Sequence, residues 1–101
     1  MYRQGDVLIV VATTVPRSAR RMDHCVIALG EATGHTHRVE VGAEQLVGED
    51  GIQYLRVLGA SADVIHEEHA TITLPGPAVY RIVHQREYAP AAPRRMVAVN
   101  D

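Results

Sequence analysis

Residues 30–41 read GEATGHTHRVEV and join a glycine-bounded turn to a run in which valine alternates with polar residues. If the second half of this segment is a strand, its side chains alternate between two faces. His35, His37, Val39 and Val41 then share one face, which we expect to point toward the core. Burying an unpaired imidazole is costly, so both histidines need polar partners. A metal ion is one partner that would serve both.

The chain on either side of this segment predicts more short strands. Runs of β-branched and apolar residues are separated by glycine, proline and Asp-Gly turn signals. The expected strands cover residues 7–12, 24–29, 36–41, 44–47, 52–58, 63–66, 70–74 and 79–88. Since no long segment holds the period of a helix, the sequence predicts an all-β fold. We expect a small antiparallel β-barrel or sandwich of about seven to eight short strands.

A chain of 101 residues fits a single domain. We expect residues 1–90 to form one β domain, because Pro90 and Pro93 end regular structure. Residues 91–101 then form a C-terminal tail or an edge strand, either here or on a neighbouring subunit. The chain has no Phe or Trp, and this thin aromatic supply to the core favours a homo-oligomer.

Charge and cysteine content exclude several classes of protein. The formal net charge is −2, and no basic block points to nucleic acid. All ten basic residues are Arg, which suits phosphate or carboxylate recognition but equally fits the codon bias of a GC-rich genome. A single cysteine, Cys25, rules out an internal disulfide. The first residues lack a signal-peptide pattern, and the longest apolar run, residues 7–12, is too short for a bilayer. We therefore expect a cytoplasmic protein without membrane contact.

A second histidine cluster, His-Glu-Glu-His, occupies residues 66–69. In a helical turn or a bulged corner, His66 and His69 would face the same side and reach one ion. In an extended segment only one of them would join the first pair, and we then expect it to be His69. The predicted metal ligands are therefore His35, His37, His69 and His66. Imidazole suits a divalent ion, with zinc, iron or manganese as the candidates.

The carboxylates inside this second cluster add chemistry to the predicted site. Glu67 or Glu68 would serve as a carboxylate ligand, as a hydrogen-bond partner of a ligand, or as a catalytic general base. The alternative is that His35 and His37 are core histidines bonded to backbone carbonyls, with residues 66–69 as a solvated corner.

The remaining histidines, His24 and His84, fit a structural role better than a ligand role. His84 shares a strand face with Tyr80 and Ile82, so it is a spare ligand.

Three motifs resemble one known pattern. The GEATGHxH stretch at residues 30–37, the HEEH stretch at residues 66–69 and the QREY stretch at residues 85–88 resemble a family of short bacterial and phage-associated proteins without an assigned function. The resemblance covers nearly the whole chain and implies no activity.

A more distant resemblance is to the cupins. The first cupin motif places His-x-His on a strand, followed by a Glu and a Gly. Residues 35–37 match its His-x-His. Glu40 stands nearer than the motif's Glu, and Glu44 stands farther away. A further cupin histidine follows a Pro-x-Gly turn, and here His84 follows residues 75–77 at a longer spacing. The resemblance implies a small β-barrel with inward-facing histidines.

Two functional hypotheses follow from these residues. The first is a small metal-binding β-barrel, in its catalytic version a metal-dependent enzyme with hydrolytic or oxygen-dependent chemistry and Glu67 or Glu68 as base. The second is a non-catalytic assembly module with structural histidines, which oligomerises and binds a protein or RNA partner. In that case the arginines would supply phosphate contacts. The sequence leaves both open.

Overall fold

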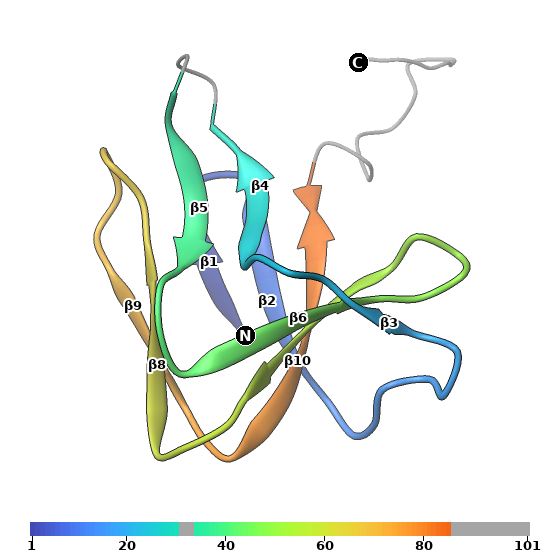
Figure 1. The fold of residues 1–101 in the computed structure, drawn as a ribbon. Helices are drawn as coiled ribbons and strands as arrows, with labels where there is room; N and C mark the ends of the chain where they lie inside the picture. Colours follow the sequence, from blue (N-terminus) through green and yellow to red (C-terminus); the bar gives the residue numbers. More distant parts are fainter. Residues whose placement is uncertain (31–33, 86–101) are drawn as a thin grey trace, which may run out of the picture.

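The computed structural model describes residues 1–30 and 34–85, which fold into two antiparallel β-sheets (Figure 1). The ten strands are β1 (Tyr2–Gln4), β2 (Val7–Ala12), β3 (Arg20–Arg21), β4 (Val26–Leu29), β5 (Thr36–Val39), β6 (Ala43–Val47), β7 (Gln53–Val57), β8 (Ser61–Ile65), β9 (Ile72–Pro75) and β10 (Ala78–His84). No α-helix occurs in these two ranges, so the all-β prediction is confirmed. The domain boundary expected at residue 90 and the tail expected at 91–101 lie outside the described residues.

The larger sheet has the strand order β1-β2-β10-β7-β6-β3, and the smaller one has the order β4-β5-β8-β9. Every pairing is antiparallel. Within the described part of the chain, no hydrogen-bonded ladder joins the two sheets into a closed cylinder. The same part of the chain holds no helix of the length and apolarity that a membrane span requires.

Two strands were not expected from the sequence. Strand β1 has three residues, too few for alternation to be recognised, and it turns into β2 through Gly5, whose φ is +60°. Strand β3 is the pair Arg20–Arg21, which lies at the sheet edge and pairs with the end of β6. A short, charged edge strand of this kind protects a sheet from unwanted pairing, but its composition is that of a loop.

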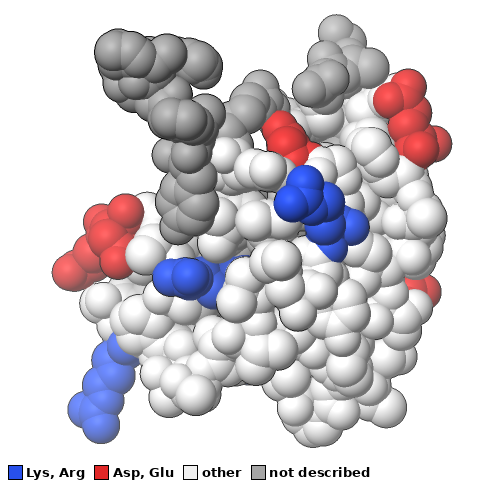
Figure 2. Space-filling model, turned by 180° about the vertical axis from the view of Figure 1, so that it is seen from behind, with Lys and Arg blue, Asp and Glu red and all other residues white. Residues whose placement is uncertain are grey.

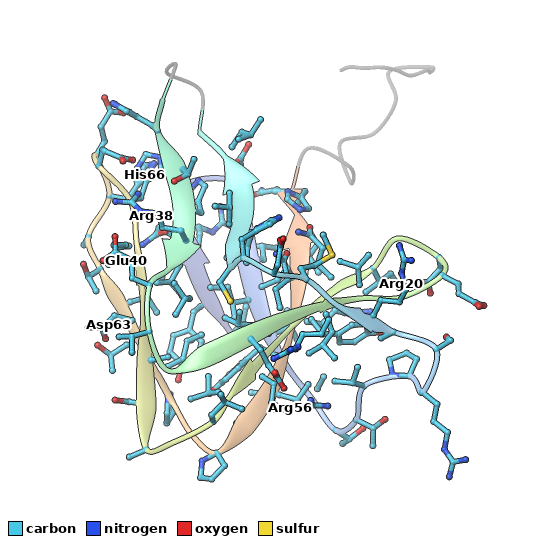
Figure 3. All side chains as sticks on the ribbon, viewed as in Figure 1. Arg20, Arg38, Glu40, Arg56, Asp63 and His66 are labelled. Atoms are coloured by element: carbon cyan, nitrogen blue, oxygen red, sulfur yellow. The ribbon has the colours of Figure 1, made fainter. Side chains whose placement is uncertain are left out.

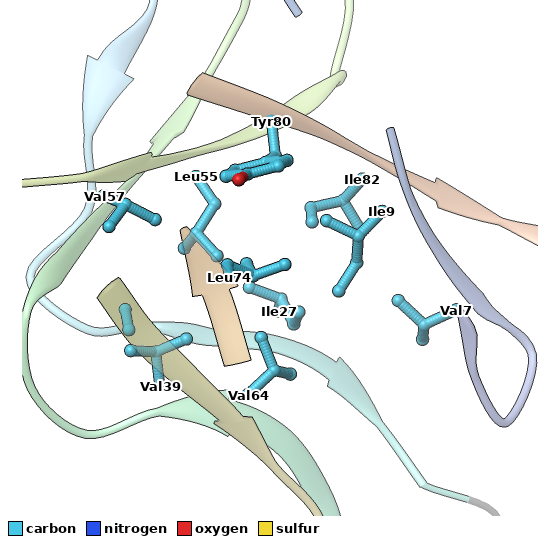
Figure 4. Close-up of a cluster of buried hydrophobic side chains, with 11 residues drawn as sticks. Val7, Ile9, Ile27, Val39, Leu55, Val57, Val64, Leu74, Tyr80 and Ile82 are labelled. Carbon is cyan, nitrogen blue, oxygen red and sulfur yellow. The ribbon is translucent and has the colours of Figure 1, made fainter. Parts of the chain in front are cut away.

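The core lies between the two sheets, and its buried side chains come from β2, β7 and β10 of the larger sheet and from all four strands of the smaller one (Figure 4). The larger sheet contributes Val7, Ile9, Leu55, Val57, Tyr80 and Ile82, and the smaller sheet contributes Ile27, Val39, Ala62, Val64 and Leu74. Tyr80 brings an aromatic ring into the core and donates its hydroxyl proton to the carbonyl oxygen of Pro75 at 2.6 Å. That bond satisfies the polar end of a buried tyrosine.

A ladder of buried amides also ties the sheets together. Gln45 donates from Nε2 to the carbonyl oxygens of His24 and Val26, at 3.2 Å each. Its Oε1 accepts from Nε2 of Gln53 at 2.8 Å, and Oε1 of Gln53 accepts from Nε2 of His84. His84 is therefore held by a structural hydrogen bond, as expected for this residue.

The surface carries dispersed charge. Figure 2 shows the molecule from behind, where acidic and basic side chains are scattered among uncharged residues. On that face no patch of a single sign is visible over the described residues.

One end of the fold, at the top of Figure 1, collects three connections and one strand end. They are the turn between β1 and β2, the segment between β4 and β5, the bend between β8 and β9, and the end of β10. The N–H of Gly30 donates to the carbonyl oxygen of His35 at 2.7 Å and closes the second of these connections. This end of the fold carries the predicted site residues.

Candidate metal centre

Strand β5 points His37 into the molecule. His37 is 2% exposed and Val39 is 6% exposed, while Thr36 and Arg38, which alternate with them along the strand, are half-buried. The expected alternation is therefore confirmed for these residues. The same expectation is wrong for Val41, which is 80% exposed, because β5 ends at Val39 before the chain turns.

The second cluster bends at the end of β8, where Figure 3 labels His66, and both of its histidines lie close to His37. The N–H of Glu68 donates to Nδ1 of His66 at 3.0 Å and closes the bend. Ring centroids lie 4.3 Å apart for His37 and His66, 4.6 Å for His66 and His69, and 5.9 Å for His37 and His69. The structure thus has the corner rather than the extended segment, and the two clusters lie side by side.

His35 lies just before β5, and its ring centroid is 5.7 Å from that of His66. Nδ1 of His35 and Nε2 of His66 are buried and have no hydrogen-bond partner among the described residues. Nδ1 of His35 approaches Oε2 of Glu68 to 3.6 Å, which is long for a hydrogen bond. Native buried polar atoms are nearly always paired, so these two nitrogens are the part of the cluster that needs an external partner.

Gln4, at the end of β1, fixes the proton of His37. The amide Nε2 of Gln4 donates to the carbonyl oxygens of Val64 and Ala70, at 2.9 Å each. Its Oε1 must therefore be the acceptor in the 2.9 Å bond to Nδ1 of His37. The neutral ring then carries its proton on Nδ1, which leaves the lone pair on Nε2. This is how proteins orient a histidine that binds a metal.

The two carboxylates of the second cluster have different surroundings. Oε1 of Glu67 accepts from the N–H of Thr36 at 3.1 Å, and its Oε2 lies 3.0 Å from Nη1 of Arg38. Backbone N–H donors, its own and that of Thr36, lower the pKa of Glu67, and Arg38 adds to this effect. Glu67 is thus bound to the start of β5. Even so, one ligand atom each of His35, His66 and Glu67 lie within 4.8 Å of one another.

A hollow of ≈ 230 Å³ opens beside the rings. It is lined by Gly5, Asp6, Gly30, His37, His66, Glu68, His69 and Gln85. Of the two carboxylates in the bend, Glu68 is the one that lines it, and its side chain is 64% exposed.

Burial shapes the electrostatics of the hollow. It lowers the pKa of His37 to about 4, and the neighbouring His66 acts in the same direction, whereas Asp6 opposes both. At neutral pH His37 is therefore an uncharged imidazole with a free lone pair.

Acid should destabilise the metal-free protein through His37. Its pKa is about 4 in the folded protein and near 6.5 in the unfolded chain. Because the unfolded state binds more protons between these values, this contribution to stability is present above pH 6.5 and is lost as the pH falls toward 4. The loss is at most about 3 kcal/mol, because solvent screening reduces what the pKa difference contributes to stability. Urea unfolding in EDTA across this range measures it, and a His37→Gln variant should show a shallower dependence on pH. Equal dependence in both proteins would contradict the assignment.

His24 lies apart from this cluster. It is exposed, and its Nδ1 accepts from the N–H of Val26 at 3.2 Å. Among the described residues it makes no ring contact with another histidine.

The fold and site together define a class: a small all-β protein with a histidine cluster at one end of two packed sheets. The chain belongs to the family described as a domain of unknown function (DUF8820), whose model matches residues 3–85. Searches of curated proteins and of solved structures found no match.

The match agrees with the expected membership of an uncharacterised family, and it includes all four clustered histidines. Neither the family match nor the two searches support the cupin resemblance.

Proposed function

We propose that this protein binds a divalent metal ion where His35, His37, His66 and His69 gather, with zinc, iron or manganese as the candidates. The observation that carries the proposal is the hydrogen bond between Nδ1 of His37 and Oε1 of Gln4, which leaves a buried, neutral Nε2 lone pair. The unpaired Nδ1 of His35 gives further support.

The ring separations also suit a shared ion. An imidazole bound at about 2.1 Å has its centroid roughly 3.2 Å from the ion, so two such rings have centroids roughly 4.5–5.2 Å apart at octahedral or tetrahedral angles. The ring centroids of His37 and His69 lie 5.9 Å apart. This is a little beyond the range, so a small side-chain adjustment would let both rings bind one ion.

The open hollow favours a reactive ion over a closed structural one, because a catalytic ion keeps a position for water or substrate. A divalent ion at such a position polarises a bound oxygen or activates water. Glu68 is then the better general base, since it lines the hollow. Glu67 is engaged with Thr36 and Arg38.

Metal analysis of protein purified without a histidine tag tests the proposal. We expect close to one ion per chain, and a rise in melting temperature of about 10 °C when Zn²⁺ is added at about a hundred times its Kd. Absence of stoichiometric metal, together with an unchanged melting temperature in Zn²⁺, Fe²⁺ and Mn²⁺, would refute it. On the same sample, native mass and the ratio of nucleic-acid to protein absorbance test the alternative of an oligomeric module that binds protein or RNA.

Gly5→Ala should weaken metal binding, whereas Gly51→Ala should not. Both glycines have positive φ, +60° and +84°, so alanine strains either turn by about 1–2 kcal/mol. A Cβ at Gly5 would lie 2.9 Å from Nε2 of His69 and 3.3 Å from Cε1 of His37, whereas one at Gly51 meets nothing within 4 Å. We expect about a tenfold loss of Zn²⁺ affinity for the Gly5 variant alone, measured by competition titration. Equal affinities would contradict an ion beside His37 and His69.

A further inference from the structure

We infer that His66 does not bind the ion but donates a hydrogen bond beside it, so that the site receives a small ligand with an oxygen acceptor, such as a carboxylate. This inference rests on the proposed metal site and assigns different roles to two histidines whose rings touch.

The first step is the proton of His66. A backbone N–H can only donate, so Nδ1 of His66 must accept the 3.0 Å bond from Glu68. The neutral ring then carries its proton on Nε2. His37 has the opposite arrangement, because Gln4 accepts from its Nδ1. One ring therefore offers a lone pair at Nε2, and its neighbour offers an N–H.

A metal ion at Nε2 of His66 would need this arrangement reversed. Its proton would have to move to Nδ1, where it would face the N–H of Glu68, and the hydrogen bond that closes the bend would be lost. His37 needs no such change before it binds an ion.

The second step is the space in front of Nε2 of His66. The nitrogen is buried and lacks a hydrogen-bond acceptor among the described residues. A Cβ on Gly30 would lie 2.6 Å from it and 3.0 Å from Cβ of His35. A side chain at residue 30 would therefore fill this space, which glycine leaves clear.

The third step is what can occupy that space. An N–H needs an acceptor, and Nδ1 of His35, on the ring next to that of His66, is a second buried nitrogen without a hydrogen-bond partner among the described residues. Gly30, His66 and Glu68 all line the hollow. A negatively charged ligand oxygen can bind the ion on one side and accept the hydrogen bond from the N–H of His66 on the other. Hydrogen bonds to a charged oxygen are stronger than those to a neutral one.

Long-range ¹H–¹⁵N NMR of the labelled full chain tests this atom by atom. Without metal, we expect the protons of His37 and His66 on Nδ1 and Nε2 respectively. With one equivalent of Zn²⁺, nitrogens of His37 and His69 should shift, while Nε2 of His66 keeps its proton. Acetate added next should shift that proton. A metal-bound shift at Nε2 of His66, or no response to acetate, would overturn the inference. If Zn²⁺ moves no histidine nitrogen, the metal site itself is wrong.

Two variants provide an independent readout. His66→Phe, which has no donor, should keep its Zn²⁺ affinity within about threefold while acetate binding weakens at least about tenfold. His66→Gln retains a side-chain N–H and should recover part of the acetate affinity. A loss of Zn²⁺ affinity of about a hundredfold in both folded variants would identify His66 as a ligand.

Discussion

Replacing His37 with alanine should lower Zn²⁺ affinity by about a hundredfold or more. The lone pair on its Nε2 is set by the bond to Gln4, and the ring is buried, so the ion finds no equivalent donor when the side chain is removed. Isothermal titration at neutral pH measures the change. His24→Ala is the matched control, because His24 is exposed and makes no ring contact with a described histidine.

His69→Ala separates a lost ligand from a lost fold. The His37 variant leaves a buried cavity and could unfold, whereas His69 is exposed and its removal should leave the metal-free melting temperature nearly unchanged. We expect its Zn²⁺ affinity to fall by about tenfold or more. If folded His37 and His69 variants both bind Zn²⁺ as the His24 variant does, the metal lies elsewhere.

Part of this arrangement was predictable because strand parity is a strong physical constraint. A period of two in residues 36–39 places His37 on the same face as Val39, and the structure confirms it. The prediction failed at Val41 because parity cannot tell where a strand ends. Likewise, the His-Glu-Glu-His spacing was compatible with a corner, but the bend became definite only with the hydrogen bond from Glu68 to His66.

The parts that could not be predicted depend on contacts distant in sequence. Gln4 lies 33 positions from His37 and bonds to it from a strand too short to be recognised. Gly5 and Asp6 line the hollow. They form the turn between β1 and β2, and β2 lies beside β10 in the larger sheet. A weak sequence signal existed for the turn, since Gly5-Asp6 precedes an apolar run, but nothing local indicated that it would meet the histidines.

The distinction between Glu67 and Glu68 has the same origin. The two are adjacent and chemically alike, so the sequence offered either as base. Their roles separate only because Arg38, two residues beyond Thr36 on β5, is positioned to pair with Glu67. That pairing depends on β5 lying beside the end of β8, as the register Arg38 with Ile65 shows.

Gln4→Leu should cause the largest loss of stability among substitutions around the site. Gln4 is 2% exposed and bonds to the carbonyl oxygens of Val64 and Ala70 and to Nδ1 of His37. Leucine would remove the donor to both carbonyl oxygens and the acceptor for the Nδ1 proton of buried His37, at about 1–3 kcal/mol for each buried group left unpaired. We expect the free energy of unfolding to fall by about 3 kcal/mol or more, measured by urea unfolding in EDTA. The melting temperature should fall by more than about 10 °C.

Gln85→Leu is the matched control for this change, because Gln85 is exposed and, among the described residues, its side chain accepts one bond, from Arg3. It should cost less than about 0.5 kcal/mol.

The Gln4 variant has a second expected effect, since without the amide the proton of His37 is free to occupy either nitrogen. Zn²⁺ affinity should then fall by about tenfold or more even under conditions where the variant is folded. A Gln4 variant as stable as the Gln85 variant would show that the amide does not bind β1 to β5 and β8. A destabilised variant with unchanged Zn²⁺ affinity would instead confine Gln4 to a structural role and remove the main support for His37 as a ligand.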